Sequence, residues 1–238
     1  MRRRRPKGMT KEEAIRRIKD IEEPEFAGHA ETYDLAVRAM NEFPDDHEVQ
    51  SKGQWAIALG AITQARFIVT AGGVERTIKA MERFPMDERL QADGCETLRL
   101  LCSKQEGMRR TLQGGGLKVV CLALAQHSEN VRLQQEAVGA LTKFTSKDPK
   151  AVLAQGGFES IMHVMEMFPK YSWVQMWACQ SITEFSKLDP KRVEGMDGYT
   201  KVEEVMKKFT VEEGKKMWDK SEAVQYFGRN ALMTKPVP

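Results

Sequence analysis

The sequence predicts an all-α protein built as a solenoid of stacked helical repeats. One segment, residues 72–98, recurs in degraded form along the chain, and its matching anchors Val49, Leu90, Leu133 and Val174 are separated by 41, 43 and 41 residues. A constant period of this size is typical of stacked helical repeats, in which each unit buries its apolar face against its neighbours. Glycine doublets recur at the same place in each period, where helices must change direction. They are Gly72–Gly73, Gly115–Gly116 and Gly156–Gly157, with Gly198 in the corresponding position.

Residues 1–9 are predicted to form a basic arm without regular structure, because Pro6 and Gly8 disfavour a helix. Its cations are Arg2, Arg3, Arg4, Arg5 and Lys7. Such a cluster fits three roles: a solvated tail, a contact to an acidic protein or nucleic-acid surface, or part of a targeting signal. The acids Glu12 and Glu13 follow at once and count against an organellar presequence.

A helix is predicted to begin at Thr10, because Thr10 and Glu13 form a capping box. Apolar residues then recur at helical spacing up to Ile21, and Pro24 ends the pattern. We expect this segment, residues 10–27, to cover the open end of the array, since a terminal repeat must have its apolar face covered. An amphipathic helix that awaits a partner is the alternative.

The array itself is predicted to span residues 28–232 as one domain, in repeats 28–71, 72–114, 115–155, 156–197 and 198–232. In the first repeat we expect helices over 32–43, 48–62 and 64–70. Phenylalanines 43, 84, 168 and 209 share one repeat position and are predicted to pack in the core or between repeats. The last repeat is atypical, because residues 224–228 match 174–178 with a shift of 50 rather than 41. About nine extra residues therefore lie between Thr210 and Glu222, and 233–238 are a tail.

The repeat pattern can now be compared with known families. The unit resembles the armadillo repeat, which has one short and two longer helices. The resemblance rests on the order of its parts: a glycine pair, an apolar helix, a short polar turn, and then the pattern Val/Leu-Gln-x-x-Gly/Ala-x-x-Ala/Thr-Leu. The resemblance implies a right-handed α-solenoid of armadillo-type three-helix repeats over residues 28–232. HEAT repeats have a less regular glycine signal, and tetratricopeptide repeats are shorter, so both fit less well.

Composition and motifs exclude several classes of function. The net charge of +3 is too small to require a nucleic-acid partner, and no apolar run approaches the roughly 20 residues of a membrane helix. We find no phosphate-binding loop, nucleophile elbow or metal-ligand spacing, which predicts no enzyme activity, no metal and no cofactor. The four cysteines are expected to be free thiols inside helices. They indicate a reducing intracellular compartment, the cytoplasm first, with the nucleus or an organelle matrix as alternatives.

In armadillo proteins the third helices of the repeats line a groove, and the resemblance maps that groove onto this sequence. The position where peptide-binding families carry asparagine falls on Leu59, Leu100, Lys143 and Glu184. The preceding position, often Trp, falls on Trp55, Glu96, Gly139 and Gln180, and one turn outward lie Lys52, Asp93, Glu136 and Trp177. No asparagine occupies the first set, so the known peptide-backbone clamp is missing. The predicted binding residues are Trp55, Leu59, Glu96, Leu100, Glu136, Lys143, Trp177, Gln180 and Glu184.

Two functional hypotheses follow. The first is a non-catalytic protein-interaction scaffold or accessory subunit of a multi-subunit complex, which binds through the groove, the edges or the basic arm. The alternative is a nucleic-acid or ribonucleoprotein binder that uses the arm together with Arg16, Arg17, Arg109 and Arg110. Acids interleave with bases along the helices, which favours the first hypothesis.

Overall fold

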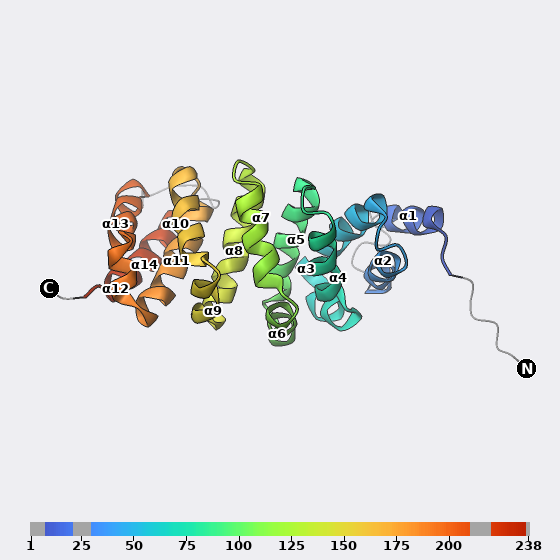
Figure 1. The fold of residues 1–238 in the computed structure, drawn as a ribbon, viewed down its shortest axis with the longest axis horizontal. Helices are drawn as coiled ribbons and strands as arrows, with labels where there is room; N and C mark the ends of the chain where they lie inside the picture. The colour runs from blue at the N-terminus through green and yellow to red at the C-terminus, as the bar shows by residue number, and fades with distance from the viewer. Residues whose placement is uncertain (1–7, 21–29, 210–219, 237–238) are drawn as a thin grey trace, which may run out of the picture. The chain divides into compact units, whose positions relative to one another are not determined.

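The computed structural model describes residues 8–20, 30–209 and 220–236 (Figure 1). Fourteen helices and no strand lie within these ranges, so the predicted all-α class is confirmed. The chain divides into two compact units, with the boundary after Gly116. Each unit is described by itself, and the prediction of a single continuous domain stays a prediction.

The first unit begins with α1 (Lys11–Lys19), which packs against α2 (Ala30–Glu42) and α3 (His47–Ala71). The Thr10 hydroxyl accepts a hydrogen bond from the backbone N–H of Glu13 at 3.2 Å, as the capping box predicts. Ala14 and Ile18 are fully buried. The Lys11 ammonium lies 2.7 Å from the carboxylate of Asp46, the residue that caps α3. This ion pair lowers the pKa of Asp46 and raises that of Lys11.

The helix α3 covers the two helices that the sequence predicts over 48–62 and 64–70. Two helical segments meet in it at a kink, where Gln64 has a non-helical φ of −114° and ψ of 24°. No glycine or proline lies between residues 61 and 71, so neither residue type causes this kink. The expected break between a longer and a shorter helix is therefore confirmed.

A glycine pair connects α3 to α4 (Gly73–Arg83). Gly72 has a φ of +91°, a left-handed conformation that residues with a Cβ rarely adopt. A Cβ on Gly73 would approach the Ile68 carbonyl oxygen at 3.0 Å and collide with the Ile68 side chain. The first glycine therefore supplies the turn, and the second allows the two helices to approach closely.

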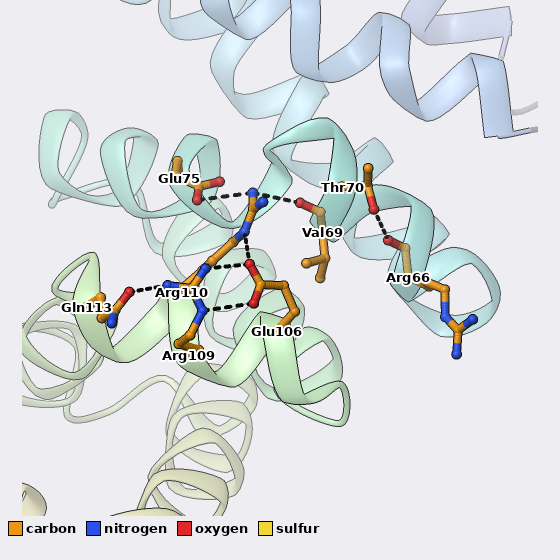
Figure 2. A network of polar contacts seen from close by, with 8 residues as sticks. All are labelled: Arg66, Val69, Thr70, Glu75, Glu106, Arg109, Arg110 and Gln113. Atoms are coloured by element: carbon orange, nitrogen blue, oxygen red, sulfur yellow. Dashed lines mark hydrogen bonds and ion pairs between the residues drawn. The ribbon is translucent and has the colours of Figure 1, made fainter.

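The remaining helices of the first unit are α5 (Glu88–Leu101) and α6 (Gln105–Gln113). Arg110 on α6 ties this helix to its neighbours, as Figure 2 shows. Its guanidinium donates to the Val69 carbonyl oxygen at the end of α3 and lies 3.4 Å from the Glu75 carboxylate on α4. Glu106 accepts hydrogen bonds from Arg109 and Arg110, which lower its pKa to about 2.

The second unit repeats the same arrangement. Its helices are α7 (Gly116–Gln126), α8 (Val131–Lys147), α9 (Pro149–Ala154), α10 (Gly157–Met167), α11 (Ser172–Leu188), α12 (Pro190–Gly195), α13 (Gly198–Lys208) and α14 (Ser221–Leu232). The short helices α9 and α12 begin with proline. The Asp148 side chain accepts a hydrogen bond from the backbone N–H of Ala151 in the first turn of α9, and Asp189 accepts one from the backbone N–H of Arg192 in the first turn of α12.

A buried glutamine joins the two longer helices of each repeat. Its side-chain amide donates two hydrogen bonds to carbonyl oxygens at the end of the preceding helix, ten and seven residues upstream. The four donors are Gln50, Gln91, Gln134 and Gln175, and the distances range from 2.7 to 3.1 Å. The last carbonyls of a helix have no partner within the helix. We call this arrangement the glutamine clamp, since it satisfies these groups while it fixes the pairing of the two helices.

The last repeat keeps the glutamine clamp across a longer connection. Gln225 donates to the carbonyl oxygens of Met206 and Phe209, 19 and 16 residues upstream, at 2.6 and 3.0 Å. Each separation is nine residues longer than in the other repeats. Most of the extra segment, residues 210–219, lies outside the described residues.

The repeated phenylalanines differ in burial. Phe168 is buried, whereas Phe43, Phe84 and Phe209 are partly exposed. All four residues directly follow the last residue of a helix. A core position is therefore confirmed for Phe168, and packing of the other three between repeats stays a prediction.

Candidate functional site

In the first unit, four of the predicted binding residues lie on two helices that pack side by side. Trp55 and Leu59 are on α3, and Glu96 and Leu100 are on α5. Leu59 is exposed and the other three are partly exposed. The structure thus leaves all four accessible.

A pocket of about 300 Å³ opens next to Trp55. Its lining residues are His47, Glu48, Ser51, Lys52 and Trp55 from α3, with Arg89 from α5. His47 lies 2.7 Å from the Asp87 carboxylate and packs against the edge of Phe84. These contacts hold one wall of the pocket between the two helices.

An apolar run continues from Trp55 along the same helix. Leu59 is 39% exposed and Ile62 is 62% exposed. The three residues are spaced by four and three positions, which places them on one face of an α-helix. The groove positions compared in the sequence ended at Leu59, so Ile62 was not among the predicted binding residues. Its spacing of seven residues from Trp55, two helical turns, could have indicated it.

In the second unit, the predicted binding residues differ in accessibility. On α8, Lys143 is exposed but Glu136 is only 7% exposed and contributes little surface. On α11, Trp177, Gln180 and Glu184 are partly exposed, and Glu184 accepts a hydrogen bond from Lys187.

Trp177 belongs to an aromatic pair that sequence analysis did not identify. Its ring centroid is 5.4 Å from that of Trp173, one turn earlier on α11. The Lys220 ammonium lies 4.1 Å from the centroid of Trp173, which is a cation–π geometry. The four-residue spacing of the tryptophans could have indicated the pair, whereas the contact with Lys220 spans 47 residues and needed the structure.

The basic arm lies outside the described residues. The predicted contact residues Arg2, Arg3, Arg4, Arg5 and Lys7 therefore remain a prediction.

The described part of the chain gives little support to metal binding or to a reactive cysteine. No group of three or more His, Cys, Asp or Glu side chains there could hold a metal ion. Cys95, Cys102 and Cys179 are buried free thiols. Burial raises the pKa of Cys121 to about 11 and that of Cys179 to about 12, so both remain protonated thiols at neutral pH.

No single described helix is both long and apolar enough to span a membrane. The helices α3 and α4 meet the length and composition criteria only as a pair, and that pair is bent by 93°.

Comparison with solved structures identifies the fold. A designed armadillo repeat protein, solved in complex with the peptide (KR)4, superposes with a TM-score of 0.67 over 94% of this chain and 100% of its own, at 15% sequence identity. The fold is that of an armadillo repeat array. An engineered protein from a structural genomics consortium matches the array with a TM-score of 0.66, 20% identity, and coverage of 94% of this chain and 90% of its own.

Comparisons by sequence add no relative to this result. No protein-family model matches the chain, and no curated protein matches it either. Armadillo arrays commonly mediate protein binding and are typically non-catalytic.

Proposed function

We propose that this armadillo array is a non-catalytic protein-interaction scaffold, and that its first unit binds a partner through the accessible face of α3 and α5. We call this surface the α3/α5 face and define it by Trp55, Leu59, Ile62, Glu96 and Leu100. The observation that carries the proposal is the exposed apolar run of Trp55, Leu59 and Ile62 next to a pocket.

Energetic arguments favour a protein as the occupant of this face. Burial of apolar surface gives roughly 25 cal/mol per Å², so exposed leucine and isoleucine side chains gain free energy when a partner covers them. Tryptophan is enriched among the residues that dominate protein interfaces. A partly exposed Trp55 beside a pocket therefore has the properties of an anchor residue.

The charges of the described helices give less support to a nucleic-acid partner. Arg17 pairs with Glu13, and Arg109 and Arg110 both bind Glu106, as Figure 2 shows for the latter two. Phosphate binding depends on cations that neutralise the backbone of the nucleic acid. Three of the four arginines named for this alternative already have acidic partners within the chain.

The proposal extends to a role as an accessory subunit in a larger assembly. The α3/α5 face lies in the first unit, and the Trp173–Trp177 pair lies in the second. Two separate candidate surfaces would allow the array to contact two proteins, or two parts of one protein.

Affinity purification of the tagged full-length chain from its native cells tests the proposal. The test variant is Leu59→Ser with Ile62→Ser, and its matched control is Met86→Ser with Met167→Ser, which removes two exposed methionines elsewhere. We expect a stoichiometric protein partner that is lost in the test variant and kept in the control. Retention of every partner by the test variant, or recovery of nucleic acid that moderate salt releases, would refute this function.

A further inference from the structure

We propose that the pocket beside Trp55 binds an acidic side chain, and that the α3/α5 face binds the apolar residues that follow it in an extended segment of the partner. This inference rests on the proposed function and specifies the class of partner. The first step concerns the charges that line the pocket.

Arg89 presents the most accessible charge at the pocket. Its side chain is 69% exposed, whereas the Asp93 carboxylate that it faces is 2% exposed and lies 4.0 Å from the guanidinium Nε. This distance is too long for a hydrogen bond. The guanidinium carries five N–H donors in a planar arrangement that matches a carboxylate. Arg89 can therefore bind an incoming acid without breaking a hydrogen bond to Asp93.

Lys52 supplies a second cation on the opposite helix. Its ammonium lies 3.9 Å from the Glu48 carboxylate, and Glu48 is also 4.0 Å from Lys11. The one acid in the lining is thus flanked by two lysines, neither of which is within hydrogen-bonding distance of it. Ser51 and Trp55 also line the pocket, and each of these side chains carries one donor group. The pocket is therefore rich in donors, which suits a carboxylate.

The geometry of α3 relates the pocket to the apolar run. Lys52 and Ile62 are ten residues apart, which corresponds to about 15 Å along a helix. An extended chain covers about 13 Å in four residues and directs alternate side chains to the same side. A five-residue segment of the form acid-x-apolar-x-apolar could therefore place its acid in the pocket and its last apolar residue near Ile62, with the other apolar residue between the pocket and Ile62.

This preference is opposite in sign to that of the designed armadillo repeat protein, whose ligand is the basic peptide (KR)4. The same fold can serve both ligands, because the charges of the third helices are set by side chains and not by the helix arrangement. Charge complementarity is thus the property to test.

Fluorescence anisotropy with the full-length chain measures this preference. The probe is a labelled twelve-residue peptide with a central Glu-Ser-Leu-Ser-Phe flanked by Gly and Ser, and the comparison peptide has Lys in place of Glu. The test variant is Lys52→Glu with Arg89→Glu. The matched control, Lys79→Glu with Lys118→Glu, changes the net charge equally at exposed positions outside the pocket.

We expect the wild-type chain to prefer the acidic peptide. Placing two like charges opposite the ligand should weaken binding of the acidic peptide by about tenfold or more and strengthen binding of the lysine peptide, while the control keeps the wild-type preference. Equal binding of both peptides by the wild-type chain, or an equal loss in the control, would overturn the inference.

The two proposals fail in different ways. If the Leu59→Ser and Ile62→Ser variant loses the native partner but the wild-type chain shows no preference for the acidic peptide, the binding face is correct and the acidic class is wrong. If that variant also keeps the native partner, both proposals are wrong.

Discussion

Replacement of Gln134 by methionine tests whether the glutamine clamp stabilises the array. The Gln134 amide donates to the Leu124 carbonyl oxygen at 2.7 Å and to the His127 carbonyl oxygen at 3.0 Å, and both bonds are buried. The His127 oxygen also accepts from the N–H of Asn130, whereas no other described group is seen to donate to the Leu124 oxygen. Methionine keeps the side-chain volume and removes both donors.

The expected cost has two parts. A buried carbonyl left without a donor costs about 1–3 kcal/mol, and loss of the second bond costs about 0.5–1.5 kcal/mol. Gln134→Met should therefore lower the free energy of unfolding by about 1.5–4.5 kcal/mol. Such a change is large compared with the total stability of a typical domain.

Urea unfolding followed by circular dichroism at 222 nm measures this change. The matched control is Gln135→Met on the same helix, because Gln135 is only partly buried and its side chain makes no hydrogen bond within the described residues. We expect the control to lie within about 0.5 kcal/mol of the wild-type chain. If the two variants are equally stable, the clamp does not contribute as argued.

Two further predictions concern the corners and the surface network. Gly73→Val and Gly157→Val should each destabilise the array by about 1–3 kcal/mol, because the added side chain would overlap Ile68 or Val152; unchanged melting temperatures for both variants would contradict this. The pKa of Glu106 lies at about 2, below its ordinary value of 4.5, so its carboxylate stabilises the folded chain above pH 4.5 and this contribution is lost as the pH falls towards 2. Glu106→Gln should therefore lower the melting temperature at pH 7 and have little effect near pH 2; an equal effect at both pH values would argue against an ionic contribution.

Much of the fold follows from the sequence alone. The period, the glycine pairs and the capping box at Thr10 are local patterns, and each predicts its structure from residues that are close in the chain. The break near Gln64 was also expected, because the repeat pattern separates a longer from a shorter helix there, and the structure places a kink at this residue. The repeated glutamine was visible as an anchor of the pattern, but its two carbonyl acceptors required the packing of two helices.

The candidate site was predictable to a lesser extent. Trp55 and Leu59 followed from the repeat position that the armadillo resemblance assigns. The pocket needed the structure, because Lys52 and Arg89 occupy positions four residues apart in the repeat, on different helices. Likewise, the contact between Lys220 and Trp173 could not be predicted, because it joins residues 47 positions apart in the sequence.

The clamp of Gln225 has a consequence for how the array can change its length. In the last repeat, the same two hydrogen bonds form although the intervening chain is nine residues longer. The register of the paired helices is therefore set by a side chain and not by the length of the connecting turn. The turns at residues 43–47, 84–88 and 168–172 thus become natural places to graft a peptide, since the array could display an inserted sequence without any change in its helix pairing.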